Sequence, residues 1–320
     1  MHPTNKVKIP QIKNISGLIE KFTKNKSYSK SGISLNLIKN SFENALEYKG
    51  IADGTRGVLL FIATVCLIFI LYTVFDLARF SIKWPNDWIK HIGLFLYASV
   101  AVPFGIYFFI KNLRFELFRP QDEPVIFDRK NRKVYRIFRE VVPGWKGLCK
   151  KWPLRSAIYD WDLVHAEHHA TVIVNTSTVS RNHALVLIVR NSRTDSNIKD
   201  SFTIGSGQLG EVTVPALYEH IRKFMEEDGP HTPPAAIISP VVYPTTIWEC
   251  LASVGPYGEN FKTLWNDHKI WLTMIIIFYP ILFFIMTPIG IFSWISYQTA
   301  IPIRWSQEIT EAIGKPMELP

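Results

Sequence analysis

Three long apolar blocks dominate the pattern of hydrophobic and polar positions along the chain. The first covers residues 58–75 and the second residues 92–110, and the third runs without a charged side chain from residue 270 to residue 303. A bilayer core about 30 Å thick requires about 20 apolar residues in a helix, so each block is long enough to cross it. Charge-free runs of this length are rare in soluble folds. The pattern therefore predicts an integral membrane protein.

Prolines interrupt the third block at positions 280, 288 and 302. One tilted and kinked helix from about residue 270 to residue 295 would place the C-terminal tail on the far side of the membrane. A turn at "TPIG", residues 287–290, would instead give a re-entrant hairpin whose halves are each too short to span. We favour the single kinked span and keep the re-entrant segment as the alternative.

The region between the second and third blocks has the pattern of a small β domain. Residues 125–138 predict a hairpin with a polar turn, and residues 157–174 and 183–191 read as further strands. Helical spacing then begins at Thr213 and places Leu217, Ile221 and Phe224 on one face. Strands closed by one amphipathic helix are typical of a β-sandwich or half-open barrel. The predicted fold class is thus an α+β membrane protein.

Residues 33–48 are expected to form an amphipathic helix, because Leu35, Ile38, Phe42 and Leu46 share one helical face. The complete organisation that we predict is a basic N-terminal region with this helix (1–56), a transmembrane hairpin (57–110), the β domain (111–230), a proline-rich linker with amphipathic helices (231–269), a transmembrane or re-entrant segment (270–303) and a C-terminal tail (304–320).

The distribution of basic residues predicts the orientation. Residues 1–56 carry ten Lys and Arg against four acidic residues, and residues 111–139 carry nine more. The loop at residues 76–91 has only three, together with Trp84 and Trp88, which suit a membrane interface. By the positive-inside rule the N-terminal region and the β domain are cytoplasmic. We therefore expect a multi-pass membrane protein whose N-terminal region and β domain share the cytoplasmic side.

The cysteines and the catalytic motifs exclude several classes of protein. The three cysteines, Cys66, Cys149 and Cys250, are far apart, which argues against a disulfide framework and a structural zinc site. Neither a GxSxG elbow nor an HExxH motif occurs. His165, Glu167 and His169 would share a strand face and could bind zinc with His183, but we do not favour this alternative. No catalytic, metal or cofactor-binding residue is predicted.

Two stretches combine basic and aromatic residues, at positions 127–140 and 145–155. The residues that we select there as candidate membrane or partner contacts are Arg129, Lys130, Arg132, Lys133, Trp145, Lys150, Lys151 and Trp152. Such stretches can bind nucleic acid through phosphate contacts and stacking. Both also follow a span on the leaflet that carries anionic lipids, where Lys, Arg and Trp are favoured. We therefore favour contact with anionic lipids over nucleic acid.

The sequence "PVIFDRKNRKVYRI", the strand around Trp161, the helix ending "FMEEDGP" and the tail with Trp305 carry a resemblance. Together with the apolar blocks they resemble a family of proteobacterial membrane proteins, domain of unknown function 6708. The strand and helix order is also similar to pleckstrin-homology-like modules that follow two spans. The resemblance to the family implies a multi-pass protein of the bacterial inner membrane and an association with type VI secretion and toxin loci.

These observations lead to three functional hypotheses. The first is a non-enzymatic immunity or accessory protein that contacts a secreted toxin or a secretion-system component. The alternative is a membrane scaffold or sensor whose basic β domain binds anionic headgroups. A channel or transporter is less favoured, because residues 58–75 and 92–110 contain no ionisable side chain that would line a polar path.

Overall fold

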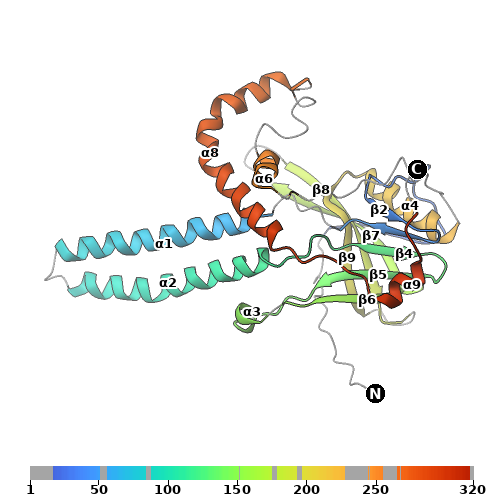
Figure 1. The fold of residues 1–320 in the computed structure, drawn as a ribbon, viewed down its shortest axis with the longest axis horizontal. Coiled ribbons are helices and arrows are strands. Elements are labelled where there is room, and N and C mark those ends of the chain that lie inside the picture. Colours follow the sequence, from blue (N-terminus) through green and yellow to red (C-terminus); the bar gives the residue numbers. More distant parts are fainter. Residues whose placement is uncertain are drawn as a thin grey trace, which may run out of the picture.

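The fold is that of a helical hairpin attached to a mixed α+β domain (Figure 1). The computed structural model describes residues 17–50, 56–83, 88–150, 152–174, 179–192, 197–227, 244, 246–254, 265–266 and 268–317. The predicted proline-rich linker and the N-terminal 16 residues therefore lie largely outside the described part. A third long helix leaves the junction between hairpin and domain and curves away from the hairpin.

The strands form two antiparallel sheets. Their bounds are β1 Leu18–Phe22, β2 Ile38–Ser41, β3 Ala45–Tyr48, β4 Val125–Asp128, β5 Lys133–Arg139, β6 Leu154–Asp160, β7 Val164–Val174, β8 Val179–Arg190 and β9 Ile198–Leu209. One sheet has the order β1-β7-β8-β9 and the other the order β2-β3-β4-β5-β6. The predicted hairpin at residues 125–138 is confirmed as β4 and β5, which pair in the register Asp128↔Lys133.

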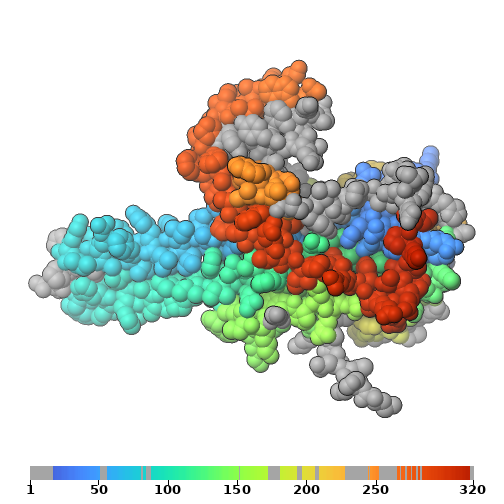
Figure 2. Space-filling model, viewed as in Figure 1, coloured from blue at the N-terminus to red at the C-terminus, as the bar shows by residue number. Residues whose placement is uncertain are grey.

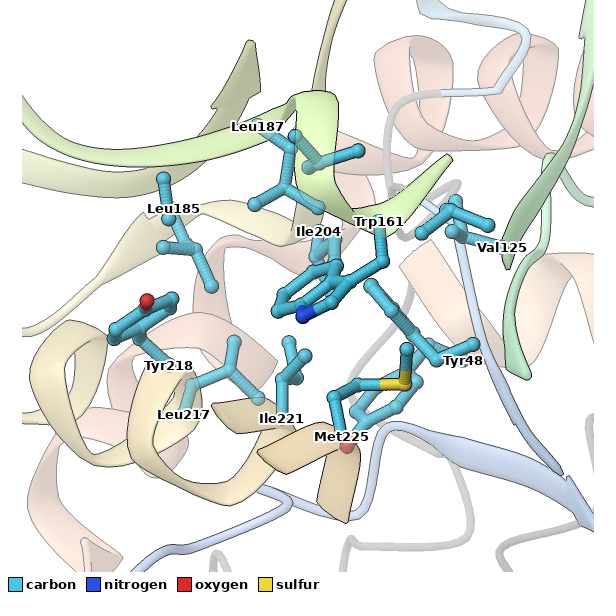
Figure 3. Packing of buried hydrophobic residues seen from close by; sticks show 14 of the residues in the cluster. Tyr48, Val125, Trp161, Leu185, Leu187, Ile204, Leu217, Tyr218, Ile221 and Met225 are labelled. Carbon is cyan, nitrogen blue, oxygen red and sulfur yellow. The ribbon is translucent and has the colours of Figure 1, made fainter. Parts of the chain in front are cut away.

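The helices cover the domain or project from it. Their bounds are α1 Val58–Lys83, α2 Trp88–Glu116, α3 Lys146–Cys149, α4 Thr213–Glu226, α6 Ile247–Val254, α8 Lys269–Gln298 and α9 Gln307–Ile313, with a 3₁₀ turn at Trp161–Leu163. The helix predicted from Thr213 is α4, and its apolar face covers the main core. Trp161 is buried at the centre of that core, among side chains from both sheets and α4 (Figure 3).

The prediction of an amphipathic helix at residues 33–48 is wrong. This segment forms β2 and β3, which join the five-stranded sheet beside β4. The physical reason is that its apolar residues are buried on both faces of the sheet. Ile38 and Tyr48 enter the main core, whereas Phe42 and Ala45 enter a second core beneath α9. One helical face could not bury both sets, but the alternation of a strand can.

Two helices, over Val58–Phe80 and Trp88–Glu116, are long and apolar enough to cross a membrane. They pack against each other, and Gly105 lies where an added Cβ would meet Ile70 at 2.9 Å. Large side chains such as Phe69, Phe95 and Phe104 remain more than 60% exposed on the hairpin. The described part of the chain leaves most of the surface of these side chains uncovered, as expected of a surface that faces lipid.

The third apolar block is not one straight helix. The segments Leu272–Phe278 and Phe283–Gln298 of α8 meet at 95°. Beyond α8 the tail returns to the β domain, where Ile309 and Ile313 of α9 are buried against the five-stranded sheet. The expectation that the tail lies across the membrane from the β domain therefore does not agree with the structure.

Candidate membrane and partner surfaces

Arg139 connects the hairpin to the β domain. Its guanidinium donates to three backbone carbonyls at the end of α2, those of Phe115 (2.9 Å), Arg114 (2.9 Å) and Leu117 (3.1 Å). The last carbonyls of a helix have no partner within the helix, so this side chain replaces the missing donors. Burial lowers the pKa of Arg139 to about 10, and the group stays charged at neutral pH. The end of β5 is thereby fixed to the end of α2.

The loop that follows β5 is built around Trp152. This indole is buried, stacks on Arg139 with 4.5 Å from guanidinium to ring, and donates through Nε1 to the carbonyl of Gly147 at 3.0 Å. Only glycine fits at position 147, because an added Cβ would lie 2.0 Å from the Val142 carbonyl oxygen. Trp152 is therefore a structural residue of this loop and does not offer a free contact surface.

Trp145 has the opposite environment. Its side chain is 70% exposed and its ring lies 4.7 Å from that of Tyr107 on α2. Tyr107 belongs to the apolar block of α2, one turn before Lys111. Trp145 is thus level with the point where α2 passes from apolar to charged residues, which is where tryptophans concentrate in a membrane protein.

The surface around α3 is basic and apolar together. Arg114 of α2 donates to the carbonyl of Leu148 at 2.8 Å and so holds α3 beside the hairpin. The side chains of Lys146 and Lys150 are exposed, as is that of Val141. Figure 2 shows this lime-green region beside the base of the hairpin. We call Val141, Trp145, Lys146 and Lys150 the α3 surface. Lys151, also predicted as a contact, lies outside the described residues.

The other predicted stretch lies at the opposite end of β5. Since Arg139 contacts α2 and Lys133 begins β5, six residue steps of about 3.3 Å separate the turn from α2, or roughly 20 Å. Figure 1 shows α4 and α9 at this end, away from the hairpin. The structure therefore does not bring the two basic stretches together, and the position of the turn does not favour the predicted membrane contact.

The basic side chains of the turn differ in their contacts. Arg132 has a positive φ of 50° and forms ion pairs with Asp162 (2.9 Å) and Glu226 (3.2 Å). Arg129 donates to Asn44 at 3.1 Å and stacks on the ring of Phe224. These two residues hold the turn against its own domain.

Lys130 and Lys133 instead line a cavity of about 300 Å³ between β5, β6 and α9. Neither lysine side chain forms a hydrogen bond or ion pair with another described residue. Glu308 and Glu311 of α9 lie on its opposite wall, and Ile158 and Ala312 contribute apolar surface. We call this cavity the α9 groove. It has a basic wall, an acidic wall and an apolar patch.

The comparison with known protein families gives a match over more than half of the chain. The profile of the family of unknown function DUF6708 matches residues 102–315. The chain belongs to the DUF6708 family. The match begins inside α2, includes the α3 surface and the α9 groove, and ends after α9, whereas α1 and β1 to β3 precede it. No curated protein and no solved structure matched the chain.

In this DUF6708 protein, His168, His169 and His183 belong to two separate contacts. His169 contacts Glu167 (2.8 Å) on one face of β7, while His168 contacts His183 (2.9 Å) on the other. His183 is therefore not beside the pair predicted to share a face with it. Among the described residues, no group of three or more His, Cys, Asp or Glu side chains is placed to hold a metal.

Sequence reasoning missed the groups that assemble these surfaces. Arg139 was counted only as one more basic residue, although it caps α2. The acidic wall was missed because the tail was expected elsewhere. The spacing of Ile309 and Ile313, with Glu308 before the first and Glu311 between the two, is an amphipathic signal that could have indicated α9.

Proposed function

We propose that this DUF6708 protein is a non-enzymatic binding protein of the bacterial inner membrane, acting by direct contact as an immunity or accessory protein of a type VI secretion toxin. The α1–α2 hairpin anchors a cytoplasmic β domain of pleckstrin-homology-like type. The strand order followed by one capping helix, α4, supports that domain type. The type VI association rests on the family resemblance.

The observation that carries this proposal is the α9 groove at the end of the domain turned away from the hairpin. Arg139 fixes the domain on α2, so a protein that approaches along the membrane normal meets this end first. Lys130 and Lys133 are available for acidic side chains of a partner, and Glu308 is available for a basic one. Complementary charges of this kind favour fast and selective association with a protein.

The use of buried titratable groups also supports a binding role. Asp200 accepts from Arg136 and Tyr159, each at 2.6 Å, and so joins the two sheets. The hydroxyl of Tyr48 lies 2.6 Å from Nδ1 of His220 and joins β3 to α4. Such satisfied pairs hold a fold together, whereas a catalytic site needs groups that a substrate can reach.

A second candidate function is a membrane scaffold or sensor that recognises anionic lipid headgroups. The α3 surface favours it, because Trp145, Lys146 and Lys150 are exposed together beside α2. Each Lys near an anionic leaflet contributes about 1 kcal/mol of attraction. The two candidates use different surfaces and are separable by mutation.

The test is affinity purification of the detergent-solubilised protein from its host, followed by co-expression with any toxin recovered. We compare the wild type with Lys130→Glu/Lys133→Glu, and use Lys146→Glu/Lys150→Glu as the matched control of equal charge change. The proposal predicts that a toxin or secretion component co-purifies and that the first variant alone loses both the partner and protection from killing. If the protein is instead purified without a toxin or secretion component, and carries anionic lipid that only the second variant loses, the immunity or accessory proposal is contradicted and the scaffold is favoured.

A further inference from the structure

We propose that α8 is a re-entrant segment, which enters and leaves the bilayer on the side of the β domain and places its bend among the acyl chains of that leaflet. The inference concerns membrane topology and does not depend on the proposed function. It rests on the positions of both ends of α8, on the segment that precedes it and on its own shape.

The C-terminal end of α8 is fixed at the junction. The hydroxyl of Ser296 donates to the carbonyl of Glu116, the last residue of α2, at 2.9 Å. The backbone N–H of Ile301 donates to Arg119 at 3.1 Å, and that of Met317 donates to Ser41 at 2.8 Å. The chain from residue 296 to residue 317 therefore stays on the β domain side of the hairpin.

The start of α1 lies at the same level. Gly57 has a φ of +82°, and an added Cβ there would lie 2.4 Å from the backbone nitrogen of Ser293. Arg56 stacks on Tyr297, with 4.6 Å from guanidinium to ring, and donates to the carbonyl of Pro120. The last turns of α8 are thus packed between the first turn of α1 and the segment after α2.

The chain also approaches α8 from this side. Helix α6 packs on the C-terminal half of α8, where an added Cβ at Gly290 would lie 2.7 Å from Leu251. Cys250 of α6 is fully buried and hydrogen-bonded to Ser293. Because Ser293 also contacts Gly57, α6 is level with the base of the hairpin.

Residues 255–268 connect α6 to α8 and are poorly suited to cross a bilayer. They contain Glu259, Lys262 and Asp267. As a helix, fourteen residues would reach only about 21 Å, which is short of the roughly 30 Å core. A non-helical crossing would leave backbone groups unpaired in lipid. The N-terminal end of α8 is therefore expected on the β domain side as well.

The shape of α8 agrees with this topology. The longer arm, Phe283–Gln298, is about 24 Å long at 1.5 Å per residue and does not span on its own, and it meets Leu272–Phe278 at 95°. Pro280 lies inside the helix between the two arms, where its ring breaks the regular hydrogen bonding. In Figures 1 and 2, α8 leaves the junction, diverges from α1 and curves back towards the side of the β domain.

The surface at the bend fits hydrocarbon. Ile277, Phe278, Ile281 and Phe284 are between 53% and 78% exposed, and no charged residue occurs between positions 270 and 303. The α1–α2 hairpin beside this surface is the part of the molecule that crosses the membrane. The occupant that these residues fit is the acyl-chain layer of the leaflet nearest the β domain. The α3 surface and α8 would then contact that leaflet on opposite sides of the hairpin.

The test uses single cysteines in a variant whose three native cysteines are replaced. The substitutions replace exposed lysines and are Lys130→Cys, Lys269→Cys, Lys315→Cys and Lys83→Cys. Each variant is labelled with a membrane-impermeant maleimide in sealed vesicles of both orientations. We expect positions 130, 269 and 315 to react from one side and position 83 from the other. Reaction of position 269 from the side of position 83, or from neither side until detergent is added, would overturn the proposal.

A second measurement checks the packing. Gly57→Ala should loosen α8 and increase protease cleavage between α8 and α9 several-fold. Gly93→Ala is the matched control, because an added Cβ at Gly93 meets nothing within 4 Å. Equal cleavage in the two variants would contradict the docking of α8 on which the topology depends.

Discussion

The turn at Arg129–Lys133 and the loop at Trp145–Trp152 have similar compositions, yet the fold puts them at opposite ends of the β domain. In the turn, Arg132 is paired with Asp162 and Glu226, and Lys130 and Lys133 face the α9 groove. In the loop, Trp152 is buried on Arg139 while Trp145 stands exposed beside Tyr107 of α2. The difference arises because one strand, β5, separates the two stretches.

This comparison shows that basic and aromatic content alone does not identify a membrane contact. The same residue types cap a helix, stack in a buried site, form ion pairs or lie exposed on the surface, depending on their place in the fold. Substitutions in the turn and in the loop test this comparison directly.

The largest effect is expected within the loop itself. Trp152→Ala removes a buried indole and should lower the free energy of unfolding by about 4 kcal/mol. Trp145→Ala, at a 70% exposed position, should change it by less than about 0.5 kcal/mol. Chemical unfolding in detergent micelles measures both. Equal losses would show that the two tryptophans are not divided between structure and surface.

Removal of the Arg139 side chain, which links β5 to the end of α2, should lower the free energy of unfolding slightly less. Arg139→Ala leaves three carbonyls at the end of α2 without their side-chain donor and should destabilise the protein by about 3 kcal/mol. Arg155→Ala is the control, because Arg155 makes one exposed ion pair, with Glu140. Thermal unfolding compares the two, and a loss for Arg155→Ala as large as that for Arg139→Ala would contradict the role of Arg139 as a cap.

Acid should lower the free energy of unfolding through His220 on α4. Burial lowers the pKa of His220 on α4 from 6.5 to about 4. The unfolded chain therefore binds a proton below pH 6.5 while the folded state resists it until about pH 4, so stability falls as the pH falls through this window. The loss should be about 2 kcal/mol between pH 7 and pH 5.

His220→Gln should flatten this dependence, because glutamine can still bond the Tyr48 hydroxyl but does not titrate. Unfolding curves at pH 7 and pH 5 provide the measurement. An unchanged slope in the variant would assign the effect to other groups, such as His168, whose pKa burial also lowers.

The smallest effect is expected in the turn. Arg132→Ala removes two exposed ion pairs and should cost about 1 kcal/mol. Arg132→Gly loses the same pairs but relieves the positive φ of 50°, so it should be less destabilising than alanine. Chemical unfolding of the two variants separates the effect of the lost charge from that of backbone strain. A glycine variant that is less stable than the alanine variant would show that the backbone at position 132 is not strained.

Much of the fold was predictable because its signals are local. The apolar blocks indicated α1 and α2, the alternation at residues 125–138 indicated β4 and β5, and the helical spacing after Thr213 indicated α4. The segment at residues 33–48 was predicted wrongly, because its apolar residues fit a helical period, whereas in the structure they lie on strands and are buried in two separate cores.

The surfaces were less predictable because they depend on long-range contacts. Arg139 becomes a cap only when β5 returns to α2, and Glu308 joins Lys133 only when the tail folds back on the sheet. The spacing of Ile309 and Ile313 indicates that α9 is a helix, but it does not indicate where that helix docks, and nothing near Arg139 indicates that it caps α2. The selection of Trp145 and Lys150 needed only proximity to a span, so the fold leaves that prediction in place for testing.

The most direct test of the central comparison is the depth of each basic stretch relative to the membrane. A fluorophore is attached at Lys146→Cys or at Lys130→Cys in the otherwise cysteine-free protein, in nanodiscs that contain anionic lipids with spin-labelled headgroups. Our account predicts strong quenching at position 146 and none beyond background at position 130. Quenching at position 130 equal to or stronger than that at position 146 would contradict it.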